Sequence, residues 1–494
     1  MLSLTVFLPL AAAALLLAWR ALPEAAVRAV WVAVSAIELA LVAALWVTYD
    51  GPGPDHETDR PWMPSAGAGY HVGVDGLSLP LLALTTVVFL ACAVHSLSGQ
   101  RALRRFAALF LALETTCLGL FAALDLILFF LFFDLSIVGM YLVIAGWGHG
   151  SRAARSALVF FLYTFLGSLA LLLGFIGLYA ASDPHTFDIA ELTAAPPLES
   201  GAAGTLVLAA IVVGLAVKTP VFPFHTWLPP AHTDAPAAGS AVLAAVLLKM
   251  GTYGFVRIAM PILPGPWRDW ALVLVVAGVV SALYGALVAL AQSGFKRMVA
   301  YTSVNHMGYI LLALGAAGLL SGADEQARTT AVTGAVVLMV SHGLVTGALF
   351  LLSGVLWDRG GTYDMGAWGG LAGAMPRFAA LTAVAAFASL GLPGFSGFVA
   401  EFQIFAGSLG PAPVATALAL LGILVTAGLL LWALHRVFLG PRREPRPVDA
   451  DLRPAELSAV APLLGLSLLV GVLPRALLDT VEPAARTAVD LLAR

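Results

Sequence analysis

Charge and cysteine are scarce in this sequence. Only 11% of the 494 residues are charged, 60% are hydrophobic, and the mean hydropathy is +0.95. Such a composition excludes a soluble globular protein and indicates a helical membrane protein that crosses the bilayer several times. The two cysteines, Cys92 and Cys117, lie in apolar runs, which argues against a disulfide framework or a metal cluster. The glycine-rich motifs of nucleotide sites are also missing from the sequence.

The sequence contains many long apolar runs. Runs of about 20 residues, which suffice to cross a bilayer, occur at about fourteen places. They lie near 2–19, 29–48, 78–98, 104–123, 125–146, 154–181, 204–222, 236–260, 270–291, 298–319, 329–355, 377–408, 412–437 and 457–474. The first run lacks the basic start of a signal peptide, so we interpret it as a span. The expected fold is all-α, with about 14 transmembrane helices.

The loops between these runs differ in charge. About fifteen Lys and Arg residues follow odd-numbered runs and about seven follow even-numbered runs, and the loops 50–60 and 183–199 are acidic. Positive charge is enriched on the cytoplasmic side of membrane proteins. We therefore expect a multi-pass protein of the bacterial inner membrane with both termini on the outer side.

Residues 211–250 combine several features that are unfavourable inside a membrane. Lys218 lies in an apolar run, prolines follow at 220, 223, 229 and 230, and Lys249 lies in the next run. A lysine at bilayer depth costs roughly 3 kcal/mol and needs a partner or water. Broken helices are tolerated at that depth only inside protein or against water. The stretch therefore predicts a polar path within the membrane.

A second break, LPGFSG at 392–397, interrupts the twelfth run. Runs four to eight and nine to thirteen then form two groups of five, each with a broken fourth member, and the odd number of crossings inverts the second group. We therefore expect two inverted five-helix repeats with broken helices 7 and 12. The expected units are helices 1–3 (1–100), the first repeat (101–262), the second repeat (263–440), and a cytoplasmic loop, helix 14 and tail (441–494).

Asp134, in ILFFLFFDLSIVGMYLVI, is a carboxylate whose only polar neighbour in the sequence is Ser136. Lys218 is the natural cation for it, because a nearby positive charge keeps a buried carboxylate ionised. Such a pair can take up or release a proton when nearby charge changes. The alternative is a static ion pair that fixes helix packing. Buried ion pairs stabilise poorly compared with apolar side chains, which favours a function.

Four more ionisable side chains lie in later runs: Lys249, His306, His342 and Glu401. Histidine accepts and releases protons near neutral pH, although each histidine has a hydrogen-bonded packing role as its alternative. Lys249 lies too deep for easy snorkelling, and an interfacial lysine is its alternative. Glu401 follows the second break by one turn. With Asp134 and Lys218, these groups form a row on successive helices, which suits proton transfer.

Three residues are candidate auxiliaries of this row: Glu114, His225 and Lys296. Glu114 could tune the Asp134–Lys218 pair, whereas Glu38 could face another subunit. Lys296 lies near the cytoplasmic end of its run, where snorkelling and proton input are both open. His225 stands with His232 and Asp234 around a helix break, but without the spacing of a zinc site, so lining of a wet cavity is favoured over metal binding.

Five stretches carry a resemblance to a known family: LFFDLSIVGMYLVIAGWGH, AVKTPVFPFHTWLPPAHTDAPAAGSAVLAAVLLKMGTYG, FKRMVAYTSVNHMGYI, SHGLVTGALFLL and LPGFSGFVAEF. They cover roughly 100–410 and resemble the antiporter-like membrane subunits of respiratory complex I (NADH:quinone oxidoreductase), closest to the chain M (mitochondrial subunit 4) type. The resemblance implies a fourteen-helix fold and a proton channel through Asp134, Lys218, Lys249, His306 or His342, and Glu401. It also implies that quinone reduction elsewhere in the complex drives the transfer.

The resemblance also defines the expected partners. They are the other membrane subunits of the complex, including paralogous antiporter-like subunits, together with the lipid bilayer, protons and internal water, and no nucleic acid. No cofactor or metal is expected in this chain; flavin, iron–sulfur clusters and quinone are expected in the partner subunits.

Two positions bear on the assignment within the family. Glu401 is similar to chain M, because the sister subunits and the Mrp antiporter subunit typically carry lysine there. Asp134 departs from the family, which usually has glutamate, and this puts its reach to Lys218 and normal pumping in doubt. An Mrp-type sodium/proton antiporter subunit is the alternative function. A structural scaffold is a third interpretation, which the number of buried charges disfavours.

Overall fold

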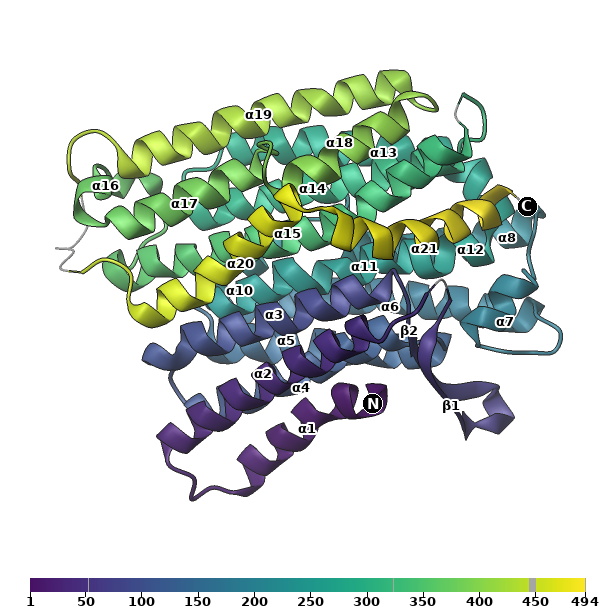
Figure 1. Cartoon of the computed structure of the whole chain (residues 1–494), viewed down its shortest axis with the longest axis horizontal. Helices are drawn as coiled ribbons and strands as arrows, with labels where there is room; N and C mark the ends of the chain where they lie inside the picture. Colours follow the sequence, from purple (N-terminus) through teal and green to yellow (C-terminus); the bar gives the residue numbers. More distant parts are fainter. Residues whose placement is uncertain (52, 323, 444–449, 494) are drawn as a thin grey trace.

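Helices make up most of the structure, a computed structural model that describes residues 1–51, 53–322, 324–443 and 450–493. Most of the helices run side by side along the long axis of the molecule (Figure 1). The first part of the chain forms α1 (Leu2–Ala18), α2 (Glu24–Val47), β1 (Asp55–Met63), η1 (Pro64–Ala66), β2 (Ala68–Val74), α3 (Ser78–His95), η2 (Ser96–Ser98), α4 (Leu103–Ala122), α5 (Leu126–Trp147) and α6 (Ala153–Ala181).

The central part of the chain contains the first helix break. It forms α7 (Ile189–Ala194), α8 (Gly201–Lys218), α9 (Leu228–Asp234), α10 (Ala237–Val242), η3 (Leu243–Leu247), α11 (Leu248–Gly254), η4 (Phe255–Ala259), α12 (Met260–Ile262), α13 (Pro264–Leu290), α14 (Phe295–Gly318) and α15 (Glu325–Gly360). The remaining elements are η5 (Met365–Ala367), α16 (Leu371–Ala374), α17 (Pro376–Ser389), α18 (Ser396–Leu409), α19 (Pro413–Phe438), α20 (Pro454–Val472) and α21 (Arg475–Ala493).

The predicted all-α membrane fold is confirmed. Among the described residues, eleven helices are long and apolar enough to span a membrane, counting α10 to α12 as one. Eleven of the fourteen predicted runs fall on these helices. The other three fall on α1, on α14 and on the pair α17 and α18, of which α1 and α17 are shorter apolar helices.

Local sequence explains where several helices begin and end. The Asp125 carboxylate accepts hydrogen bonds from the amides of Ile127 and Leu128 and so caps α5, and Asp324 caps α15 in the same way. Gly361, with φ +69°, ends α15 in the left-handed conformation that glycine adopts without strain. Caps of this kind satisfy the amides and carbonyls that a helix leaves unpaired at its ends.

Three elements were missing from the sequence-based prediction. The acidic loop expected at 50–60 belongs to an antiparallel hairpin of β1 and β2, and the loop expected at 183–199 contains α7. The expected C-terminal tail forms α21, whose buried side chains include Leu477, Val481 and Ala488. Their three- to four-residue spacing is typical of a helix with one apolar face. A search for long apolar runs overlooks such an amphipathic helix.

The two helix breaks lie where the prolines and glycines cluster. α8 ends at Lys218 and the next helix, α9, begins only at Leu228. α17 ends at Ser389 and α18 begins at Ser396, and the turn between them contains Gly391 and Gly394 with φ +70° and +100°. Both breaks lie beside ionisable side chains, Lys218 at the end of α8 and Glu401 on α18.

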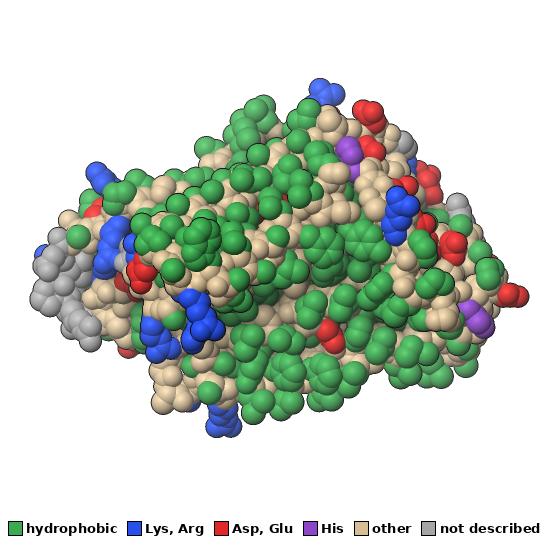
Figure 2. Space-filling view, turned by 90° about the horizontal axis from the view of Figure 1, so that it is seen from below, with side chains coloured by type: hydrophobic (Ala, Val, Ile, Leu, Met, Phe, Trp, Pro, Cys, Tyr) green, Lys and Arg blue, Asp and Glu red, His purple; other side chains and the backbone are tan. Residues whose placement is uncertain are grey.

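Charge is distributed unevenly along the molecule. Figure 2 shows Lys and Arg side chains mostly at one end, Asp, Glu and His mostly at the other, and a hydrophobic surface between them. The acidic end is also the end that carries the β-hairpin and α7, near both chain termini (Figure 1). This is the separation expected of a protein whose hydrophobic middle lies in lipid.

Candidate functional site

Lys218 is the last residue of α8 and is 1% exposed. Its Nζ donates a hydrogen bond to Oγ of Ser136 on α5 at 2.9 Å and lies 4.6 Å from the centre of the Phe133 ring. The end of the helix also exposes the Val217 carbonyl, which accepts a hydrogen bond from Nε1 of Trp227 at 3.0 Å. The break therefore holds the lysine at the centre of the bundle with α5 as its partner.

Asp134 lies between Phe133 and Ser136 in the sequence of α5 and is only partly buried. Among the described residues it forms no ion pair with Lys218, and its Oδ1 has no hydrogen-bond partner. Its carboxylate interacts with the Ser168 hydroxyl on α6 and, through charge, with Lys218. The two members of the predicted pair therefore have different hydrogen-bond partners, Ser136 for Lys218 and Ser168 for Asp134, and interact with each other through charge alone.

Lys249 lies on α11 between two π-helical segments, η3 and η4, and is fully buried. Its Nζ donates to the carbonyl of Ala244, five residues earlier, and contacts Nδ1 of His342 on α15, both at 2.6 Å. π-helical segments change the register of the backbone carbonyls and are frequent at functional sites. Here one such segment supplies the oxygen that binds the lysine.

The contact with His342 continues into a chain of ionisable groups on three helices. The ring of His342 lies 5.3 Å from the ring of His306 on α14, in an edge-to-face arrangement. Nε2 of His306 lies 3.7 Å from Oε1 of Glu401 on α18. Nε2 of His342 and Nδ1 of His306 have no hydrogen-bond partner among the described residues. The structure therefore brings together Lys249, His342, His306 and Glu401.

The second helix break positions Glu401. A Cβ atom added to Gly391 would collide with the Glu401 carboxylate, so a larger residue there would displace the acid from its present position. The positive φ of Gly391 also favours glycine. The break and the acid thus form one structural unit, and Glu401 remains 6% exposed.

The contacts of Lys218 and those of Lys249 come together at α11. Ser136, the partner of Lys218, donates a hydrogen bond to Sδ of Met250, the residue after Lys249, at 3.4 Å. Gly251 packs so closely against the end of α8 that a Cβ atom there would collide with Thr219. The Lys218 and Lys249 contacts are therefore connected through neighbouring residues of a single helix turn.

Lys296 begins α14 and is fully buried, so it does not snorkel. Its Nζ donates to the carbonyl of Ala235 at 2.5 Å and to the hydroxyl of Tyr363 at 3.3 Å. His232, which the sequence offered only as a cavity-lining residue, lies within electrostatic reach of both Lys296 and Lys249. Its ring stacks on Phe350 with centres 4.4 Å apart, and both ring nitrogens lack partners among the described residues. His232 therefore extends the row toward Lys296.

A polar cavity of about 120 Å³ lies at the end of α3, α5 and α15. His95, His149, Asp358 and Arg453 are among its lining residues. The His149 ring stacks on Trp357, which stacks on Tyr363, the hydroxyl partner of Lys296. Because each water in the liquid takes up about 30 Å³, the cavity has room for several waters. No sequence motif indicated it, since its walls come from five distant segments.

The remaining candidates lie apart from the row. Glu114 accepts a hydrogen bond from Ser35 on α2 at 3.1 Å, and Glu38 on the same helix lies near enough to interact with it electrostatically. Glu38 is fully buried within the chain, so the expectation that it faces another subunit is not what the structure shows. His225 packs against the rings of Phe222 and Tyr284. The contacts of Glu114, Glu38 and His225 do not by themselves indicate a role in proton transfer.

No metal centre is formed by the residues that the structure describes. They contain no group of three His, Cys, Asp or Glu side chains placed to hold an ion. Asp234, next to His232 in the sequence, accepts a hydrogen bond from Ser156 at 2.6 Å, while His232 and His225 contact different aromatic rings.

Comparison with known proteins identifies the family. A family model described as "NADH:quinone oxidoreductase/Mrp antiporter, TM" matches residues 123–429, which is more than half of the chain. The chain belongs to this family. A family member from Rhodobacter capsulatus, named NADH-quinone oxidoreductase subunit M, is 38% identical over 98% of this chain and 95% of that protein. The resemblance inferred from the five sequence stretches is confirmed.

Solved structures of the family share the fold over nearly the whole chain. A chain of respiratory complex I from Thermus thermophilus superposes with a TM-score of 0.89 and 33% identity, covering 100% of both chains. A chain of the Mrp complex from Dietzia sp. DQ12-45-1b gives a TM-score of 0.87 at 23% identity over 99% of this chain and 97% of that one. At this low identity, the similarity to the Mrp chain shows a shared fold but does not show a shared function.

The geometry around Asp134 predicts how the glutamate usual in this family would behave here. Asp134→Glu adds one methylene and lets the carboxylate reach further toward Ser136 and Lys218, while the half-buried position leaves room for it. We expect proton uptake within about twofold of the wild type, because the change keeps the charge and alters only its reach. The check is proton uptake in native membrane vesicles, and a loss beyond about tenfold would show that the shorter acid is required.

A charged contact also fixes the hairpin on the bundle, outside the membrane-spanning segments. Nδ1 of His71 on β2 lies 2.5 Å from Oδ2 of Asp188, which caps α7, and Nε2 lies 3.4 Å from Glu57. The bond to Asp188 raises the pKa of His71 above its usual 6.5, although burial opposes this. Burial alone raises the pKa of Asp188, but His71 and backbone amides outweigh it and leave that pKa below 3.8.

These shifts predict a pH window for the stability of the hairpin. The contribution of His71 is complete below pH 6.5 and is lost as the pH rises through its raised pKa. The contribution of Asp188 is complete above pH 3.8 and is lost as the pH falls through its lowered pKa. His71→Gln should therefore lower hydrogen-exchange protection of the Val72 amide about tenfold at pH 6. Equal ratios of variant to wild type at pH 6 and pH 9 would contradict this.

Proposed function

We propose that this chain is the proton-translocating membrane subunit of an NADH:quinone oxidoreductase in the bacterial inner membrane, with both termini on the outer side. Quinone reduction in partner subunits supplies the energy, and this chain contributes no redox centre. The observation that supports this most strongly is the run of contacts from Lys249 through His342 and His306 to Glu401. Ionisable groups inside a membrane mark ion or proton paths.

The proposed path begins at the polar cavity among the arginine-bearing loops. A proton taken up beside His149 or His95 passes by way of bound water to Lys296, then to His232 and Lys249. His342 and His306 transfer it to Glu401, because each has one ring nitrogen with no other partner among the described residues. The Asp134–Lys218 pair sets the charge beside Lys249 through Ser136 and Met250.

Protons fit this row better than sodium ions do. The contacts within it are made mainly by lysine and histidine nitrogens, for example the 2.6 Å contact between Lys249 and His342. A hard cation such as Na⁺ prefers oxygen ligands, by the same argument that holds for Ca²⁺ and Mg²⁺. The Mrp-type sodium/proton antiporter remains the second candidate only because the fold is shared with it.

Purification and transport together test the proposal. We expect flavin and iron–sulfur absorbance to copurify with this chain in mild detergent. We also expect NADH to drive proton uptake into inverted vesicles equally well in sodium-free buffer and with a sodium ionophore. Proton movement that needs sodium but no electron donor, or a chain that copurifies only with other antiporter-like subunits, would favour the antiporter instead.

A further inference from the structure

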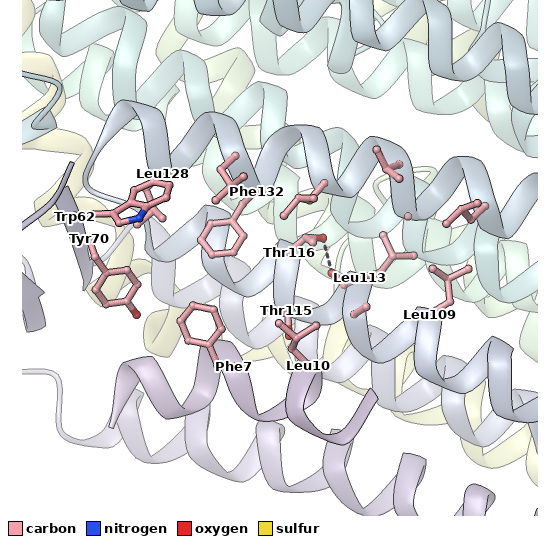
Figure 3. A pocket seen from close by; sticks show the side chains of 16 residues that line it. Phe7, Leu10, Trp62, Tyr70, Leu109, Leu113, Thr115, Thr116, Leu128 and Phe132 are labelled. Atoms are coloured by element: carbon pink, nitrogen blue, oxygen red, sulfur yellow. Dashed lines mark hydrogen bonds between the residues drawn. The ribbon is translucent and has the colours of Figure 1, made fainter. Parts of the chain in front are cut away.

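An apolar groove opens on the surface between α1, α4 and α5. Its volume is about 600 Å³. Figure 3 shows Phe7 and Leu10 on one wall, Phe132 and Leu128 opposite, and Trp62 and Tyr70 of the hairpin at one end. Apart from Trp62, Tyr70, Thr115 and Thr116, every lining residue is purely apolar. Nothing in the proposed proton path uses this groove.

The groove lies at bilayer depth and faces outward. Leu131, Leu135, Val138 and Leu142 line it from α5 and are among the exposed large hydrophobic side chains. They belong to a helix that is long and apolar enough to span the membrane. An exposed apolar groove of this size marks a binding site, and at this depth its natural occupant is hydrocarbon.

The length of the groove suits an acyl chain. It extends along α5 from Leu128 to Leu142, which is about 21 Å at 1.5 Å per residue. An unbranched acyl chain can lie along the groove over this length and leave one side against the surrounding lipid.

The hairpin adds a cation at the end of the groove that faces the acidic side of the molecule. Arg60 on β1 pairs directly with Tyr70 on β2, and paired residues of antiparallel strands point to the same face. Among the described residues Arg60 makes no ion pair or side-chain hydrogen bond. Two of the three acids of this strand, Glu57 and Asp59, lie on the opposite face with His71, and the third, Asp55, pairs with Val74 at the other end of the strand. Arg60 is therefore exposed and free beside Trp62 and Tyr70.

Trp62 and Tyr70 are the residue types that occupy the boundary between hydrocarbon and headgroups. The Tyr70 hydroxyl donates to Oγ of Ser3 at 3.0 Å, which fixes the ring against the start of α1. Arginine binds phosphate oxygens through charge-assisted hydrogen bonds. The order along the surface is thus cation, aromatic boundary and apolar groove, which matches phosphate, ester region and acyl chain.

We propose that this groove binds one phospholipid of the outer leaflet, with an acyl chain between α1, α4 and α5 and the phosphate at Arg60. The lipid covers the apolar face of α5 that carries Leu131, Leu135 and Leu142. The lipid also contacts both the hairpin and the helices α1, α4 and α5 on either side of the groove. The site does not depend on the proton path proposed above, and its assignment to the outer leaflet rests on the orientation proposed there.

Photolabelling of the intact complex tests the site. The probe is phosphatidylglycerol with a diazirine in one acyl chain, added to nanodiscs that hold the purified complex. Ala112→Phe fills the groove from α4, where Ala112 is half-buried, and Ala415→Phe is its matched control on the lipid-facing helix α19. Arg60→Gln removes the cation, and Arg475→Gln is its control, because Arg475 is 92% exposed on the far C-terminal helix.

We expect the wild type to give labelled peptides from α4 and α5. Labelling should be at least fivefold lower in Ala112→Phe and should stay at the wild-type level in Ala415→Phe. Arg60→Gln should lower labelling by phosphatidylglycerol about threefold, as expected for an exposed charge pair. It should not change labelling by a diacylglycerol with the same diazirine, which lacks the phosphate.

Two results would overturn the proposal. The first is a wild-type groove that takes no label, which would mean that a neighbouring subunit covers it. The second is labelling that is unchanged in both Ala112→Phe and Arg60→Gln, which would mean non-specific contact with bulk lipid. If Ala112→Phe fails to assemble, Arg60→Gln on the exposed hairpin still decides the question.

Discussion

Lys218→Met lowers NADH-driven quinone reduction and proton uptake together, each by about tenfold or more. The substitution removes the donor to Ser136 and the only lysine near Asp134, while an apolar side chain of similar length keeps the packing. Without that charge Asp134 lacks the nearby cation that favours its ionised form, so the pair can no longer switch. The measurement is quinone reductase rate and proton uptake in native membrane vesicles.

Leu208→Met is the matched control for this variant. Leu208 is fully buried on the same helix, and an exchange of leucine for methionine nearly conserves volume. The control should assemble and pump normally. Normal pumping by both Lys218→Met and Asp134→Asn would show that the pair only stabilises helix packing.

Lys249→Met stops proton uptake with a loss of similar size, about tenfold or more. The change removes the group that joins the α11 turn to His342, and it leaves the Ala244 carbonyl without its side-chain partner. The other ionisable side chain of α11, Tyr253, cannot replace it, because its hydroxyl donates a hydrogen bond to the carbonyl of Phe121 at 3.0 Å. Proton uptake in the same vesicles checks this, with Leu248→Met as the control at a fully buried neighbouring position.

A second substitution at Lys249 distinguishes two roles for this side chain: transferring a proton, or only providing a fixed positive charge. Lys249→Arg keeps a positive charge, but a guanidinium does not release its proton at physiological pH. If Lys249 carries protons, the arginine variant is as inactive as the methionine variant. An arginine variant that assembles and pumps at the wild-type rate would mean that fixed charge is enough.

The sequence predicted the long apolar helices and proposed a set of ionisable residues among them, but it missed the β-hairpin, α7 and α21. Lys218, Lys249 and Glu401 were identifiable because ionisable side chains beside proline or glycine breaks stand out in an apolar run. The contact between Lys249 and His342 joins residues 93 positions apart, and the order of the row along the chain did not reveal it. The sequence also could not show that Asp134 and Lys218 form no direct ion pair, because this depends on the positions of their side chains.

His232 and the polar cavity show what sequence patterns cannot supply. The role of His232 depends on its distance from two lysines and on Phe350, which lies more than one hundred residues away. The cavity walls come from segments that only the packed bundle brings together. The hairpin and α21 were missed for a different reason, because neither is a long apolar run.

The most direct test measures the rates of NADH oxidation and of proton uptake in Lys218→Met vesicles, and sodium/proton exchange in the same vesicles without an electron donor. The account predicts that both rates fall together while sodium exchange is unaffected, because this chain couples its proton path to redox chemistry in its partners. Full NADH oxidation and proton uptake with loss of sodium exchange alone would contradict it, and would identify the chain as part of an antiporter.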